Sequence, residues 1–246
     1  MRLLHNPYRT DVTVNALTRY TAYTAAAVAQ TDESVTISTG YIAAEVIDRA
    51  DLAQSTYVSQ MESADHMGVM LNEKIESLIY AEHAQVTDFD NASIGGVAGN
   101  ITVTGTNVDN IITGIAREIS EAKGDSLYER NGGFIVWRPA DFELLTSFMM
   151  ANGFSTADNA LKGGVKGGVD YMGFTHYKSN LLTAGHVLAG VKKLYHIGIL
   201  RDTYGQIVVD EKDPGLISGV GITSRIDIGI KAWNKTKVVL FDVLVS

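Results

Sequence analysis

The chain has 246 residues, a net charge of −8 and no cysteine. This length is sufficient for a buried core and one or two domains. The lack of cysteine excludes disulfides, thiolate metal ligands and cysteine nucleophiles, and the acidic balance argues against nucleic-acid binding as the main activity. No apolar run reaches the roughly 20 residues of a membrane span, and the start, MRLLHNPYR, lacks a signal-peptide core. We expect a soluble, acidic protein made in the cytosol.

Residues 1–47 predict an arm followed by a long β-hairpin. Residues 1–10 are short, basic and aromatic, which is typical of an arm rather than a core element. Residues 11–25 and 33–47 are rich in β-branched and aromatic residues and favour strands, with a turn between them. An isolated two-stranded hairpin is marginal in water, and its mixed faces build no core. We therefore expect hairpin 11–47 to lie on a neighbouring copy.

The segment 51–84 predicts one long α-helix. Its apolar and small residues recur at alternating steps of four and three, which is one narrow stripe along a helix. The stripe consists of Tyr57, Met61, Ala64, Gly68, Leu71, Ile75 and Leu78. Asp51 with Gln54 is typical of an N-terminal cap, and at 1.5 Å per residue the helix is roughly 50 Å long. It would therefore cross the whole molecule as its axis.

Two packing modes are open for this helix. A helical hairpin or a coiled-coil dimer would bury the same stripe. The small residues Ala64 and Gly68 make a thin seam, however, which favours a helix that lies across a sheet. A glycine inside a helix costs about 0.5 to 1 kcal/mol against alanine, so we expect another element to approach Gly68 closely.

The segment 86–124 predicts a loop and a second helix. Residues 86–100 are rich in turn-forming residues. The helix spans about 107–123, with Thr106 and Asp109 as a capping pair and Gly124 as its stop. Its core face carries Val108, Ile111, Ile112, Ile115 and Ile119.

The remaining segments predict a small α/β unit and then closing strands. A strand over 133–137 leads into a helix that begins at Pro139 and runs to about Asn152. Further strands are expected in 172–180 and 186–195. The closing strands belong to a mostly antiparallel sheet and are expected in 205–211, 224–234 and 237–246. This order predicts an α+β fold without an internal repeat.

Searches for catalytic and ligand-binding motifs find no site. None of the six histidines forms a pair at the i, i+4 spacing of a helix-borne metal site. His66 and His83 lie on the predicted long helix, where we expect surface positions. The sequence contains no Gly-x-Ser-x-Gly elbow and no phosphate-loop or dinucleotide fingerprint.

Two segments resemble ligand sites only weakly. The tract 162–168 combines glycines with Lys162 and Lys166 and could cradle phosphate, but it lacks the following Ser or Thr, so a flexible loop is the better interpretation. Asp88 and Asp90 could begin a divalent-cation loop, but an acidic, solvated turn is the better interpretation. We therefore predict no catalytic, cofactor-binding or metal-binding residue, and no enzyme.

The block 133–195 resembles a known family. Trp137, Arg138 and the helix from Pro139 form a strand that leads into an x-Pro helix, and a Gly-rich loop follows. A strand with Gly-Phe-x-x-x-x-Ser-Asn comes next, with Gly173, Phe174, Ser179 and Asn180 in these places, and an apolar strand closes the block. This succession resembles the major capsid protein of tailed double-stranded-DNA bacteriophages, the Hong Kong 97 type of shell protein.

The resemblance implies a phage major capsid fold with defined parts. Residues 1–10 would be the N-terminal arm and 11–47 the extended loop. The peripheral domain would comprise 48–99 and 196–233, with 51–84 as its spine helix. The axial domain would comprise 100–195 and 234–246. The chain is short for the family and lacks the long N-terminal scaffolding segment of many members, so scaffolding is expected to be separate or already cleaved off.

The resemblance also implies a structural function. The protein would form pentamers and hexamers of an icosahedral capsid around double-stranded DNA, without sequence-specific binding and without a membrane. Portal, scaffolding and cement proteins would be further partners, and the location would be the virion, assembled in the host cytoplasm. Two alternatives remain open: the shell of a cellular, encapsulin-like nanocompartment, and a small α/β enzyme or ligand-binding protein that uses the Gly-rich loop.

Some members of this family join subunits by an isopeptide bond between a hairpin lysine and an asparagine of another subunit. Here no lysine precedes Lys74. The hairpin carries Arg19 instead, whose guanidinium stays protonated and cannot act as the amine nucleophile. We therefore expect a shell without covalent cross-links.

Overall fold

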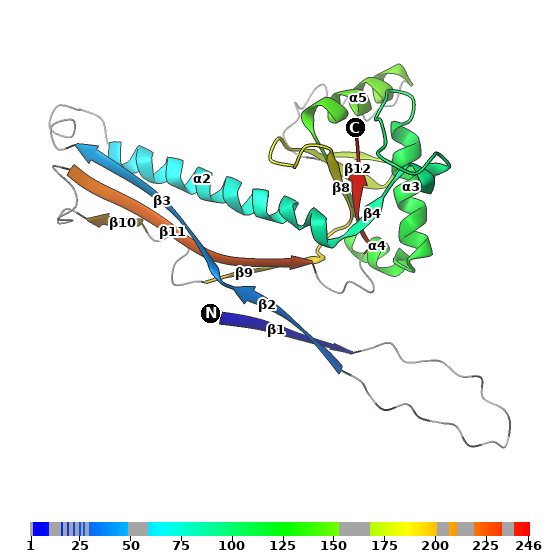
Figure 1. The fold of residues 1–246 in the computed structure, drawn as a ribbon, viewed down its shortest axis with the longest axis horizontal. Helices are drawn as coiled ribbons and strands as arrows, with labels where there is room; N and C mark the ends of the chain where they lie inside the picture. The colour runs from blue at the N-terminus through cyan, green and yellow to red at the C-terminus, as the bar shows by residue number, and fades with distance from the viewer. Residues whose placement is uncertain are drawn as a thin grey trace.

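The fold consists of an elongated half, in which one helix lies along a sheet, and a compact α/β half at one end of that helix (Figure 1). The computed structural model describes residues 2–9, 30–48, 59–152, 168–200, 207–210, 219–232 and 239–246, with a few single positions between 16 and 27. All structural statements below concern these residues. Among them, no helix has the length and apolar character needed to cross a membrane.

The elongated half is built around strand β11 (Gly219–Ala232). β11 pairs antiparallel with β3 (Thr39–Asp48), with β10 (Ile207–Asp210) and, at its far end, with β9 (Tyr195–Ile199). Alternate residues of a strand point to one face, and those of β11 that face α2 (Ser59–Ala81) are buried. They are Val220, Ile222, Ile226 and Ile228. Helix α2 therefore covers one face of this sheet, as the sequence predicted.

Only part of the predicted stripe on α2 faces the sheet. Leu71, Ile75 and Leu78 pack on it, but Met67 is the next buried residue and Met61 is 68% exposed. A pattern that repeats every seven residues drifts around a straight helix by about 20° per repeat. The N-terminal members of the predicted stripe therefore turn away from the side of the helix that carries Leu71, Ile75 and Leu78. The expected close approach to Gly68 is wrong, because a Cβ placed there would meet nothing within 4 Å.

The C-terminal end of the helix also differs from the predicted one, because α2 ends at Ala81 rather than at residue 84. The described part of α2 has 23 residues, or about 35 Å of helix, and residues 51–58 lie outside the description. A short 3₁₀ helix, η1 (Glu82–Gln85), continues the chain from α2 and leads it into the compact half.

The hairpin starts earlier than the sequence indicated. β1 (Arg2–Arg9) pairs antiparallel with β2 (Gln30–Ile37), from Arg2 opposite Ile37 to Arg9 opposite Gln30. Residues 1–10 were expected to be an arm because the segment is short, basic and aromatic. Pro7 does not prevent the pairing, since proline is tolerated in an edge strand. Most of the predicted strand 11–25 lies outside the described residues. The second predicted strand is split into β2 and β3 at Ser38.

The compact half has a six-stranded mixed sheet. Its strands, in spatial order, are β4 (Thr87–Phe89), β12 (Leu240–Leu244), β8 (His186–Val191), β5 (Gly133–Trp137), β7 (Phe174–Lys178) and β6 (Val169–Tyr171). Residues of α3 (Val108–Glu121) and α5 (Pro139–Ala151) pack on one face and form the main core with it. The predicted strand at 133–137 and the helix that begins at Pro139 are confirmed.

The start of α3 differs from the predicted capping pair. Asn107 occupies the N-cap, and its side chain turns back to the preceding loop, where its Oδ1 accepts from the Thr104 amide at 2.8 Å. The Thr106 hydroxyl contacts the Thr104 hydroxyl instead of the helix. At the other end, Lys123 has a φ of 57°, and Gly124 is the N-cap of α4 (Asp125–Asn131), a helix that the sequence analysis missed.

Two helix glycines provide a matched test of this packing. Gly68 in α2 faces open space, whereas a Cβ on Gly114 in α3 would lie 2.6 Å from the Ile94 side chain and 2.8 Å from Phe89. We expect Gly68→Ala to raise the free energy of unfolding by about 0.5 to 1 kcal/mol and Gly114→Ala to lower it by about 1 to 3 kcal/mol. Urea unfolding of the unassembled protein measures both. A loss of stability in Gly68→Ala would contradict the outward orientation of this residue.

Candidate functional site

The β1–β2 hairpin is anchored at one end and projects away from the rest of the molecule (Figure 1). At its base, Val35 is 1% exposed, and the β2 backbone at Thr36 approaches Gly229 of β11 so closely that a side chain there would clash. The Lys231 amine donates to the Ser34 carbonyl at 3.3 Å. On the partner strand of this base, Leu3 lies opposite Thr36 and is 51% exposed, and Leu4 lies opposite Val35 and is 42% exposed. The described hairpin thus carries apolar side chains that this chain leaves uncovered.

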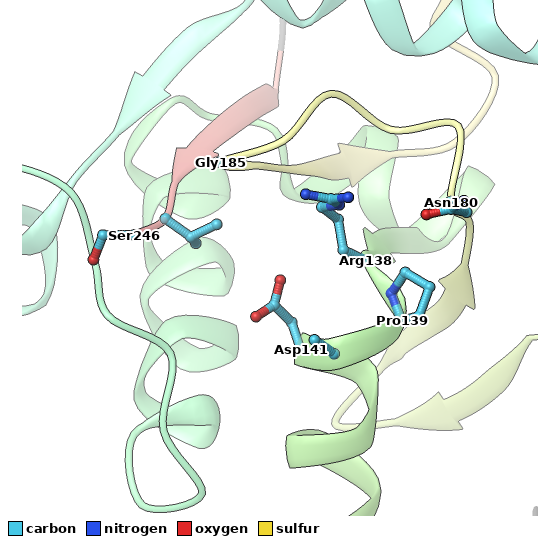
Figure 2. Close-up of a pocket in the computed structure, with 8 residues that line it drawn as sticks. Arg138, Pro139, Asp141, Asn180, Gly185 and Ser246 are labelled. Atoms are coloured by element: carbon cyan, nitrogen blue, oxygen red, sulfur yellow. The ribbon is translucent and has the colours of Figure 1, made fainter.

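A hollow of about 370 Å³ lies at the N-terminal end of α5. Figure 2 shows the side chains of Arg138 and Asp141 directed into it, with Asn180 and Ser246 at its margins. Burial raises the pKa of Asp141, and the positive charge of Arg138 partly opposes this shift. The residues that line the hollow include no histidine and form no pair of nucleophile and base. We assign no chemistry to it.

A second group of polar residues lies where α2 meets the six-stranded sheet. Asp242 is on β12 opposite Leu188 of β8, and His186 is two residues along β8, so both side chains lie on the same face of the sheet. This is the face opposite α3 and α5, and Tyr80 near the end of α2 packs on it. His83 arrives from η1, directly after α2. We call His83, His186 and Asp242 the histidine–aspartate cluster.

The histidine–aspartate cluster has short contacts. Oδ2 of Asp242 lies 3.1 Å from Nδ1 of His83 and 2.8 Å from Nδ1 of His186. The two imidazole ring centres are 4.0 Å apart. Asp242 is only 2% exposed, so its carboxylate depends on these partners for the interactions that water would otherwise supply.

Tyr195 adds a buried hydroxyl to this region. Within the described part of the chain, its hydroxyl has no hydrogen-bond partner. Burial raises the pKa of Tyr195, and the negative charges of Glu82 and Asp242 raise it further. The phenol is therefore neutral and can donate a hydrogen bond.

His176 of β7 is a separate, fully buried histidine. Its Nδ1 accepts from the Trp137 indole at 2.9 Å, and its Nε2 lies 3.1 Å from the Tyr171 carbonyl. Both ring nitrogens are therefore used by the neutral ring, with the proton on Nε2. Burial lowers the pKa of His176 to about 4, against a small opposing effect of the Tyr171 carbonyl.

The comparisons with known proteins concern the fold alone. No family model matches the chain, and no curated protein matches its sequence. Among solved structures, a chain of Mycobacterium phage Che8 matches with a TM-score of 0.72 at 14% identity, over 98% of this chain and 83% of that one. The capsid of Ralstonia phage GP4 matches with a TM-score of 0.67 at 9% identity, over 99% of this chain and 84% of that one.

A virus-like particle from Pyrococcus furiosus is also similar, with a TM-score of 0.51 at 12% identity, over 88% of this chain and 79% of that one. The phage structures therefore match more closely and cover more of the chain. This chain has the Hong Kong 97-type capsid fold. The resemblance that the sequence suggested is confirmed at the level of the fold.

Of the two segments that the sequence analysis considered as ligand sites, only the one with Asp88 and Asp90 lies among the described residues. The Gly-rich tract 162–167 lies outside the described residues, with Gly168 at its edge. Asp90 caps the 3₁₀ helix η2 (Asn91–Ile94), where its Oδ1 accepts from the Ala92 amide at 2.8 Å, which agrees with a turn. His66 is exposed on α2.

The histidine–aspartate cluster escaped the sequence analysis. His83 was expected on the surface, but its side chain is 15% exposed. Its partners, His186 and Asp242, lie 103 and 159 residues farther along the chain. No local spacing in the sequence could therefore predict that these three side chains meet. The expectation that no residue binds a metal stays a prediction. The histidine–aspartate cluster bears on it, because its side chains are of the types that bind metal ions.

The neutral state of His176 predicts a pH dependence of stability. The unfolded chain binds a proton on this histidine below about pH 6.5 and the folded chain only below about pH 4. Its contribution to stability is therefore complete above pH 6.5 and is lost as the pH falls towards 4, by up to about 3 kcal/mol. Urea unfolding of the unassembled protein at several pH values measures this loss.

His176→Gln is the control, since glutamine can keep both hydrogen bonds but does not titrate. Its stability should fall less steeply than that of the wild type between pH 6.5 and 4. In the wild type, the NMR signals of the His176 ring should titrate below pH 5. Equal slopes for the two proteins, or a ring that titrates near pH 6.5, would contradict the buried neutral histidine.

Proposed function

We propose that this chain is the structural shell protein of a tailed phage, which assembles into hexamers and pentamers of an icosahedral capsid around double-stranded DNA. The observation that carries the proposal is the projecting β1–β2 hairpin on a chain with the capsid fold. Leu3 and Leu4 leave apolar surface exposed on this hairpin. A two-stranded hairpin is marginal by itself, so a neighbouring copy is the natural cover.

The open face of the elongated half supports the same proposal. Ile42 of β3 is 65% exposed and Val46 is 54% exposed, both on the face away from α2. Exposed apolar patches on a soluble subunit mark contact surfaces. Repeated contacts between identical subunits would cover this face as well as the hairpin.

We propose that the parts of the subunit follow the family pattern. The extended loop then includes β1 and β2, α2 is the spine helix, and the sheet around β11 belongs to the peripheral domain. The six-stranded sheet with α3 and α5 belongs to the axial domain. The earlier boundary between an arm at 1–10 and a loop at 11–47 moves towards the N-terminus, because residues 2–9 pair with β2.

We further propose that the shell encloses DNA without sequence-specific contacts between the protein and the bases. The net charge of −8 provides no excess of phosphate-binding groups. Portal, scaffolding and cement proteins are the expected further partners, and the virion, assembled in the host cytoplasm, is the expected location. The rival is a cellular nanocompartment shell. The weaker match to the Pyrococcus furiosus particle gives it less support.

A shortened hairpin tests the proposed assembly. Arg9 and Gln30 form a cross-strand pair, so residues 10–29 can be replaced by an Asn-Gly turn, which fits a two-residue hairpin connection. This design keeps β2 and the buried Val35, which a deletion into β2 would remove. We expect a folded subunit with an unchanged unfolding midpoint that no longer forms closed shells, as seen by electron microscopy and size exclusion.

The full chain is the reference, and Val97→Ser, at a position that is 85% exposed, is the matched surface control that should still assemble. Closed shells of normal size from the shortened variant would refute a role of residues 10–29 in assembly. A sharp monomer of the full chain at all concentrations would refute the shell function. Particle diameter and DNA content separate a phage capsid from a nanocompartment.

A second prediction concerns cross-links. Because no lysine precedes Lys74, the hairpin has no side-chain amine that could form an isopeptide bond. Shells boiled in detergent should therefore give a single band near the 26.5 kDa of the chain. A ladder of covalent multimers would show that a lysine elsewhere has taken this role.

A further inference from the structure

We propose that the histidine–aspartate cluster binds a divalent transition metal of the zinc class and thereby fastens the end of α2 to the six-stranded sheet. The proposal concerns the folded subunit and does not depend on shell assembly. Its three residues come from η1, β8 and β12, which are remote in sequence.

The charge of Asp242 is the first argument. This carboxylate is 2% exposed, and burying an unpaired charge is costly. In the described part of the chain it pairs with His83 and His186 and with no lysine or arginine. A divalent cation would neutralise the carboxylate and use the lone pairs of both imidazoles at once.

The distances are the second argument. The possible ligand atoms of the three residues all lie within 4.8 Å of one another, and the two contacts of Oδ2 with the Nδ1 atoms are 3.1 and 2.8 Å long. Around a tetrahedral zinc ion with bonds of about 2.0 to 2.2 Å, ligand atoms are roughly 3.3 Å apart. To hold an ion, the two contacts of Oδ2 would lengthen by a few tenths of an ångström, and ligand atoms at the 4.8 Å limit would approach each other by about 1.5 Å.

The Tyr195 hydroxyl is the third argument. It is buried, it has no hydrogen-bond partner among the described residues, and it lies near enough to Asp242 to experience its charge. Three protein ligands leave one position of a tetrahedral ion for water. A water molecule in that position could accept a hydrogen bond from this phenol.

The ligand types select the metal. Imidazole nitrogen suits zinc, nickel, copper and cobalt, whereas magnesium and calcium prefer sites made of oxygen. Two histidines and one carboxylate therefore favour Zn²⁺. With three segments held by one ion, unfolding must break the site, so the ion stabilises the folded state.

Calorimetric titration of the unassembled, tag-free full chain with ZnCl₂, after removal of metals by a chelator, tests the proposal. We expect one Zn²⁺ per chain. At a hundredfold excess over Kd, the melting temperature should rise by roughly 5 to 10 °C. His83→Gln should weaken binding at least about tenfold and abolish most of this rise. His66→Gln, which changes an exposed histidine of α2, is the matched control and should bind like the wild type.

A wild-type readout guards against a variant that does not fold. Co²⁺ should shift the NMR ring signals of His83 and His186 and leave those of His66 unchanged. The absence of saturable binding to the folded wild type would overturn the proposal. So would equal affinities of the wild type and His83→Gln, or an equal loss of affinity in both variants. Because shells are not needed for this measurement, its failure is distinct from a failure of the assembly experiment.

Discussion

The elongated half of the molecule depends on the burial of one face of α2 against one strand, β11. Met67 contacts Val220 and Ile222 at one end of the strand, and Leu71 contacts Ile226 and Ile228 farther along. Apart from the hairpin base, this half is two layers thick, since the other face of the sheet exposes Ile42 and Val46. Without the apolar face of α2, the sheet would have no core.

The hairpin depends on the same strand from the other side. Gly229 of β11 has no side chain, so the backbone of β2 can lie directly on it, and Val35 fills the adjacent space. The side chains of β11 that face α2 and the glycine that faces β2 alternate along one strand. β11 therefore holds the spine of the subunit on one face and the base of its projecting hairpin on the other.

The parts of the fold that were predictable have local signals. Pro139 at the first position of α5 and the apolar strand before it define strand 133–137 and the helix start without any tertiary information. The core face of α3 was equally predictable, because Ile111, Ile112, Ile115 and Ile119 recur at the helical period. Low identity to solved capsids is compatible with this, since such patterns can be kept by many residue combinations.

The parts that were not predictable depend on contacts between remote segments. Residues 2–9 become a strand only through pairing with residues 30–37. The expected contact at Gly68 is missing because the side of α2 that faces the sheet passes through Met67 instead of Gly68. The histidine–aspartate cluster is the extreme case. Asp242 acquires its partners only when β8 and β12 pair and the end of α2 packs on their common face.

The unequal depth of the two cores has a consequence for local motion. The compact half buries a large cluster around Trp137, Leu145 and Phe174, whereas α2 packs in three small clusters. Regions with few buried apolar contacts open at a lower free-energy cost than the global unfolding of a protein. In an isolated subunit, the amide protons of β3 and α2 would therefore exchange with solvent sooner than those of β5 and β8. In the isolated subunit, the elongated half would therefore open locally more often than the compact half.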